Sequence, residues 1–80
     1  MMEKGVQVEC YSGSRYGERP LRFLRGDQWH VVKEIDASWR TPSAVHFRVR
    51  TEGGDRCELT YDERVEQWHV LTIPQVDKEY

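Results

Sequence analysis

Residues 28–40 form the longest stretch of this chain without glycine or proline that has a strand-like pattern, and this stretch limits the folds open to the chain. Aromatic and β-branched residues share one parity there, as on one face of a β-strand: Trp29, Val31, Ile35 and Trp39. Lys33 interrupts that face, and thirteen residues at about 3.3 Å each exceed the usual strand length. We therefore predict a central strand with a bend or β-bulge between Lys33 and Asp36 and with its tryptophans in the core.

Alternation of apolar and polar residues predicts further strands on both sides of this stretch. The pattern is strictest where Val45, Phe47 and Val49 alternate with basic or histidine neighbours, and a glycine-rich turn then leads to a second alternating run. The predicted strands cover residues 6–11, 20–25, 28–40, 45–50, 56–61 and 68–73. They predict an all-β fold of about six antiparallel strands in meander order, forming a small, strongly bent sheet or an SH3-like barrel.

The segments between these strands carry turn-forming residues. Residues 12–20 contain two glycines, two serines and a proline, so we predict a long loop there and expect it to be a place for function. Residues 62–67 are polar and are predicted to hold one helical turn capped by Asp62. Residues 1–80 predict a single small domain with an ordered core over about 6–73 and frayed termini.

Composition limits the setting in which the protein works. The net charge of -2 hides an uneven distribution, because residues 11–50 carry eight Lys/Arg against four acids and residues 51–80 carry three against eight. Cys10 and Cys57 lie in apolar-alternating stretches, so we predict buried thiols rather than a disulfide. No secretory or membrane-length apolar run is present, so we expect a soluble, cytoplasmic protein with no membrane partner.

No motif in the sequence points to catalysis. The three histidines and two cysteines do not stand at metal-ligand spacings, and the loop at 12–20 lacks the ending of a phosphate-binding loop. We therefore predict no catalytic residue, no metal and no cofactor. An enzyme would require a cleft in which Cys10 or Cys57 lies within hydrogen-bond reach of a histidine.

Arginines interleaved with aromatic residues predict a binding surface instead, since guanidinium groups bind phosphates and aromatic rings stack on bases. The predicted surface comprises Arg15, Tyr16, Arg19, Arg22, Arg48 and Arg50. We predict a non-enzymatic binding module, with single-stranded nucleic acid as one candidate ligand. In the alternative interpretation the arginines pair with Glu18, Glu34, Asp36 and Glu58, with Arg48 or Arg50 near Glu58. A further alternative is a structural or protein-interaction module that pairs with another protein, or as a homodimer, through an edge strand.

The chain also resembles a family of short bacterial cytosolic proteins that form a domain of unknown function. The resemblance covers roughly residues 6–73 and rests on Val8-Glu9-Cys10-Tyr11-Ser12-Gly13, Glu18-Arg19-Pro20, Val32-Lys33-Glu34-Ile35 with Trp39, Phe47-Arg48-Val49-Arg50, and Glu58-Leu59 to Tyr61-Asp62-Glu63 before Trp68. Lys33 and Ala37-Ser38 depart from the acidic centre of that pattern. The family has no assigned activity, so the resemblance implies no catalytic residues. A looser similarity to segments that accompany translesion DNA-polymerase-like proteins implies a nucleic-acid-associated role.

Overall fold

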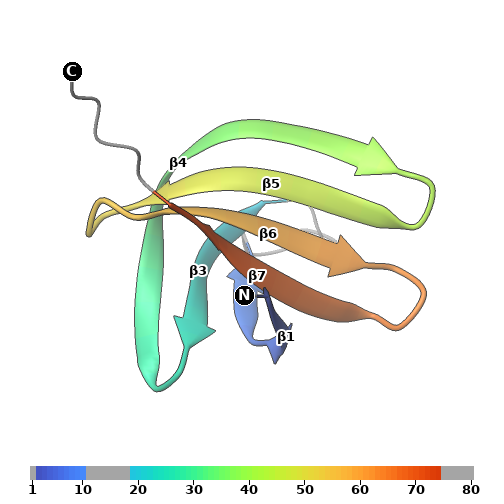
Figure 1. The fold of residues 1–80 in the computed structure, drawn as a ribbon, viewed down its shortest axis with the longest axis horizontal. Coiled ribbons are helices and arrows are strands. Elements are labelled where there is room, and N and C mark those ends of the chain that lie inside the picture. Colours follow the sequence, from blue (N-terminus) through green and yellow to red (C-terminus); the bar gives the residue numbers. More distant parts are fainter. Residues whose placement is uncertain (1, 11–18, 75–80) are drawn as a thin grey trace.

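The computed structural model describes residues 2–10 and 19–74, and in these residues it contains β-strands and no helix. The strands are β1 Met2–Val6, β2 Val8–Cys10, β3 Pro20–Arg25, β4 Gln28–Thr41, β5 Ala44–Thr51, β6 Arg56–Asp62 and β7 Gln67–Ile73. They form one antiparallel sheet in the order β1-β7-β6-β5-β4-β3-β2. The sheet curls until β1 comes close to β3, which makes a nearly closed barrel (Figure 1). The predicted all-β meander is confirmed, with seven strands instead of six.

The additional strand arises because the predicted first strand, residues 6–11, is divided between two partners. Val6 pairs with Trp68 of β7, whereas Val8 pairs with Phe23 of β3. The β1–β7 register shifts between Lys4 and Val6, and Gly5 lies there with a φ of 69°, the left-handed conformation that glycine adopts at a β-bulge. The bulge bends the chain around the corner of the barrel. Residues 2–5 therefore belong to the fold, although the sequence pattern placed them outside the ordered core.

The central strand β4 bends as predicted and belongs to both halves of the barrel. Its first residues, Gln28 to Val31, pair with β3, and its second half pairs with β5 (Figure 1). The pairing with β5 shifts register twice, between Val32 and Glu34 and between Ile35 and Ala37. These bulges lie within the segment where Lys33 and Asp36 interrupt the apolar pattern. A strand of 14 residues can thus turn a corner that a regular strand cannot.

Short turns connect the hairpins that follow. The β5–β6 hairpin is confirmed, with Phe47 opposite Leu59 and Val49 opposite Cys57. Residues 62–67, predicted to hold one helical turn, contain no helix: β6 and β7 stay paired up to Asp62 opposite Gln67, and residues 63–66 between them form a turn. Asp62 nevertheless accepts a hydrogen bond at its Oδ1 from the Arg64 amide, at 3.0 Å.

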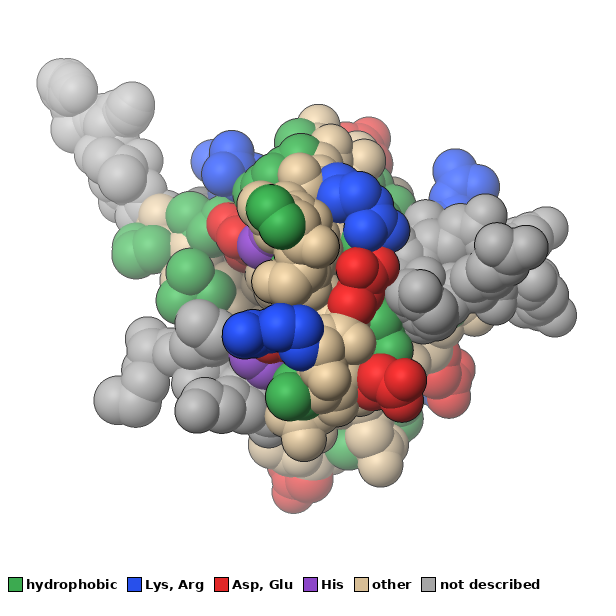
Figure 2. Space-filling model, turned by 90° about the vertical axis from the view of Figure 1, so that its right-hand side faces the viewer, with side chains coloured by type: hydrophobic (Ala, Val, Ile, Leu, Met, Phe, Trp, Pro, Cys, Tyr) green, Lys and Arg blue, Asp and Glu red, His purple; other side chains and the backbone are tan. Residues whose placement is uncertain are grey.

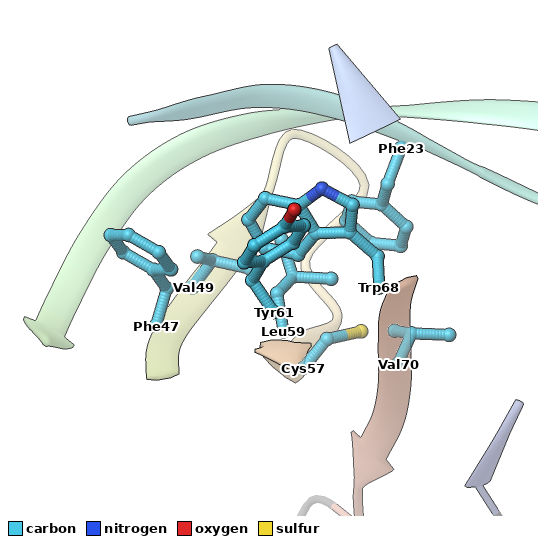
Figure 3. Packing of buried hydrophobic residues seen from close by; sticks show 8 residues of the cluster. All are labelled: Phe23, Phe47, Val49, Cys57, Leu59, Tyr61, Trp68 and Val70. Atoms are coloured by element: carbon cyan, nitrogen blue, oxygen red, sulfur yellow. The ribbon is translucent and has the colours of Figure 1, made fainter. Parts of the chain in front are cut away.

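The core lies inside the curl of the sheet and draws on β3, β5, β6 and β7. Figure 3 shows the rings of Tyr61 and Trp68 together, with centroids 5.2 Å apart and aliphatic side chains beside them. The buried cluster consists of Phe23, Phe47, Val49, Cys57, Leu59, Tyr61, Trp68 and Val70. Val32 and Ile35 of β4 pack against it.

Trp29 and Trp39, which were predicted to be core residues, are instead on the outside of the barrel, with 38% and 37% of their surface exposed. The two bulges explain this error. Each inserted residue reverses which parity of β4 faces inward. Between the two bulges Ile35 faces the core, opposite buried Val49, whereas Trp29 before the first bulge and Trp39 after the second face outward. Of the three tryptophans in the chain, Trp68 is the one in the core.

Candidate functional site

The predicted arginine surface is largely neutralised by carboxylates in the structure. Arg50 contacts Glu34 at 2.7 Å and Asp36 at 3.0 Å, and Arg48 lies 4.0 Å from Glu58. These are the acidic partners that the alternative interpretation named. Arg15 and Tyr16 lie outside the described residues, as do Glu18 and most of the loop at 12–20.

Arg22 is neutralised in a different way, by Glu9 across the β2–β3 ladder. Its Nε donates a hydrogen bond to Glu9 at 2.8 Å and its second guanidinium nitrogen donates another at 3.2 Å. This two-point contact lowers the pKa of Glu9 and raises that of Arg22, chiefly through the hydrogen bonds. Both side chains are partly exposed, so the pair fixes the position of the guanidinium more than it stabilises the fold.

The fixed guanidinium of Arg22 covers part of an exposed apolar surface on the outside of β3 and β4. Arg22 and Leu24 of β3 pair with Val31 and Trp29 of β4, so these four side chains lie next to one another and form what we call the Trp29 surface. The Arg22 Cζ lies 4.3 Å from the centroid of the Trp29 ring. Val31 is 41% exposed. The Trp29 surface therefore combines an anchored cation with uncovered apolar area.

A pocket of about 500 Å³ lies beside the Trp29 surface, between the β3–β4 turn and the β5–β6 turn. Trp29, His30 and Val31 form part of its wall, together with the acidic residues Asp27 and Glu52. The amide of Glu52 donates a hydrogen bond to the carbonyl of Val31 at 2.9 Å, which ties the β5–β6 turn to strand β4. This pocket gives the Trp29 surface a negatively charged neighbour.

Trp39 has a different environment on the second half of β4. Its ring stacks on His46, with centroids 5.2 Å apart and planes at 6°, and the Arg48 guanidinium lies 5.4 Å from its centroid. Both ring nitrogens of His46 have hydrogen-bond partners at 3.1 Å, the hydroxyls of Thr41 and Thr60. Both ring nitrogens of His46 are thus satisfied, and one face of Trp39 is already covered by the His46 ring.

The charged side chains alternate in sign at the end of the barrel that carries the β4–β5 and β6–β7 turns. Figure 2 shows basic and acidic groups next to each other there, with hydrophobic side chains scattered among them. At this end, Arg40 of β4 contacts Glu63 of the β6–β7 turn at 2.9 Å. The described residues of this face therefore present mixed charges to an anionic polymer rather than a surface of a single charge.

The cysteines differ in burial and neither forms a disulfide. Cys57 is fully buried and Cys10 is half-buried, so the prediction of two buried thiols is confirmed for Cys57 and holds in part for Cys10. Burial raises the pKa of the Cys57 thiol, which favours the neutral form over the nucleophilic thiolate. No group of three or more His, Cys, Asp or Glu side chains that could hold a metal ion occurs in the described part of the chain.

Sequence reasoning missed the Trp29 surface because it placed Trp29 in the core. The signal that could have revealed it is the pair of charged interruptions at Lys33 and Asp36, which mark the bulges that reverse the parity.

No described helix is long and apolar enough to cross a membrane. No protein-family model, curated protein or solved structure matches the chain.

Proposed function

We propose that this chain is a non-enzymatic binding module that docks a partner protein through the Trp29 surface. The observation that carries this proposal is the exposed Trp29 ring under a guanidinium that Glu9 already holds in place. Tryptophan and arginine are, with tyrosine, the residues most enriched among the energetic centres of protein interfaces. Because the salt bridge and the sheet fix Arg22 in advance, less side-chain entropy is lost when a partner binds.

The chemistry around this surface indicates what the partner presents. An apolar side chain fits over Trp29 and Val31, and a basic side chain fits the neighbouring pocket that Asp27 and Glu52 line. Four side chains make a patch smaller than the roughly 800 Å² per partner of a standard interface, which favours a transient partner over a permanent dimer.

Single-stranded nucleic acid is the less favoured ligand. Among the described members of the predicted surface, Arg22, Arg48 and Arg50 each face a carboxylate, whereas Arg19 forms no salt bridge within the described residues. Phosphates would have to displace the partners of the first three. The sequence pI of about 5.9 also differs from the basic values typical of nucleic-acid-binding domains. The charge balance therefore supports a protein partner.

Two tryptophan variants test the proposal. Immobilised wild-type chain, W29A and W39A are compared for the proteins that each captures from extracts of the source organism, since the two tryptophans are equally exposed on the same strand. We expect W39A to retain the partner and W29A to lose about tenfold or more of it, as expected when an interface centre is truncated. Equal capture by W29A and wild type would contradict the proposal, as would tight, salt-sensitive binding of a labelled oligo-dT that W29A leaves unchanged.

A further inference from the structure

Two cations that form no salt bridge within the described residues line a second pocket, at the point where β4 bends away from β3. Among the described basic residues, Arg22, Arg40, Arg48, Arg50 and Arg64 all lie within salt-bridge distance of a carboxylate. Arg19 and Lys33 make no such contact within the described ranges, and both line this pocket of about 230 Å³. Two like charges at one small site repel each other unless an anion lies between them.

The one acidic residue of the pocket is already engaged elsewhere. Glu34 accepts a hydrogen bond from Arg50 at 2.7 Å, and Arg50 is not part of the pocket. The pocket therefore keeps a positive charge. By contrast, the pocket lined by Arg48 and Arg56 contains Glu58, which lies 4.0 Å from Arg48.

The rest of the lining is apolar: Pro20, Leu21, Val32 and Ile35. Leu21 is 44% exposed although it belongs to a paired strand, because β3 pairs with β4 only from Arg22 onward and the bend opens the space beside it. The volume is below the roughly 300–1,000 Å³ of pockets that take drug-sized ligands, so it fits a group of side-chain size.

We propose that this pocket is an anion-binding site for a carboxylate or phosphoryl group carried on a short apolar stem. Arg19 and Lys33 neutralise the anionic head, and Leu21, Val32 and Ile35 contact the stem. The site is separate from the Trp29 surface, so the inference goes beyond the proposed function and does not depend on it.

Small probes test the inference by NMR titration of the wild-type chain. Butyrate and butyl phosphate carry the two candidate heads on one stem, butanol has the stem without charge, and inorganic phosphate has the charge without the stem. We expect both butyl anions to shift the backbone amide signals of Leu21, Lys33 and Ile35 saturably, and the tighter of the two identifies the head group. Butanol shifts of equal size, or inorganic phosphate binding as tightly as butyl phosphate, would overturn the proposal.

Charge variants show whether Arg19 and Lys33 contribute to anion binding. We expect R19Q and K33Q each to weaken binding by about two- to fivefold, as for an exposed charge contact, while K33R retains it. R56Q is the matched control, since Arg56 is exposed and has no salt bridge within the described residues. An equal loss in R56Q would show a general charge effect and refute the site.

Discussion

At the scale of single residues, two side chains with equal exposed fractions are not equally available to bind a partner. Trp29 and Trp39 lie on the same strand with nearly the same exposed fraction. His46 stacks in parallel on Trp39, and the hydroxyls of Thr41 and Thr60 hydrogen-bond the His46 ring. The Trp39 ring is therefore already packed within a hydrogen-bonded cluster. Trp29 is contacted by a guanidinium that Glu9 anchors, and Val31 beside it stays open. The neighbours of each ring, rather than its exposure, indicate which tryptophan binds.

The carboxylates that pair with arginines make the stability of the fold depend on pH. Hydrogen bonds from Arg22 and Arg50 lower the pKa of Glu9 and Asp36, respectively, in the folded state. A lowered folded pKa means that the stabilisation is present above the ordinary carboxyl range and is lost as the pH falls through the folded value. We expect thermal unfolding between pH 7 and pH 2 to show a smaller acid-induced drop in Tm for an E9Q/D36N variant than for wild type. The control is E52Q, since Glu52 forms no salt bridge in the described ranges; a drop unchanged from wild type in E9Q/D36N would contradict the expectation.

At the scale of elements, strands with strict alternation could be predicted from sequence, and strands with inserted residues only in part. The residues of β5 and β6 alternate without a break, so their hairpin and inward faces follow from the pattern. For β4 the pattern predicted the bend, but which side chains face inward depends on where each bulge inserts a residue. The bulge at Gly5 likewise shifts the register of β1 against β7. The candidate sites follow this division: Arg19, Arg22, Arg48 and Arg50 were predicted as surface residues, whereas the exposure of Trp29 was not.

The β5–β6 turn offers a test of local backbone geometry with a matched pair of glycines. Gly54 has a φ of 97°, a backbone conformation that residues other than glycine rarely adopt. Its amide donates a hydrogen bond to the carbonyl of Thr51 at 3.0 Å. Gly53 has no such φ, and an added Cβ would meet Thr51 at an ordinary 3.8 Å. We expect G54A to lower the free energy of unfolding by about 1–2 kcal/mol and G53A to change it by less than about 0.5 kcal/mol in urea denaturation. Equal losses in the two variants would mean that the turn does not require its left-handed residue.

At the scale of the whole molecule, a few large side chains from four strands hold both halves of the barrel together. Phe23 comes from the β3 side, while Phe47, Leu59 and Trp68 come from the opposite half of the sheet. A domain of 80 residues buries only about 60% or slightly more of the surface that its unfolded chain exposes, so its stability is on the order of a few kcal/mol. Single core residues are therefore a large share of the total.

Two leucines on neighbouring strands test this dependence. Leu59 is fully buried, while Leu71 on the adjacent strand is exposed. We expect L59A to cost about 2–5 kcal/mol, enough to unfold much of the protein at room temperature, because truncation leaves a cavity. We expect L71A to cost less than about 1 kcal/mol. Urea denaturation followed by tryptophan fluorescence measures both, and similar midpoints for the two variants would contradict the assignment of the core.

The two outermost strands of the sheet, β1 and β2, are consecutive in the chain and are joined through Gln7 alone. The covalent backbone itself therefore bridges the seam of the barrel. Unpaired outer strands are the usual starting point for intermolecular strand pairing and aggregation. Here residues 2–10 form both outer strands, so detaching this one segment would expose the unpaired backbone of β7 and of β3 at the same time. We therefore expect detachment of these first residues, around the bulge at Gly5, to make the sheet prone to intermolecular strand pairing.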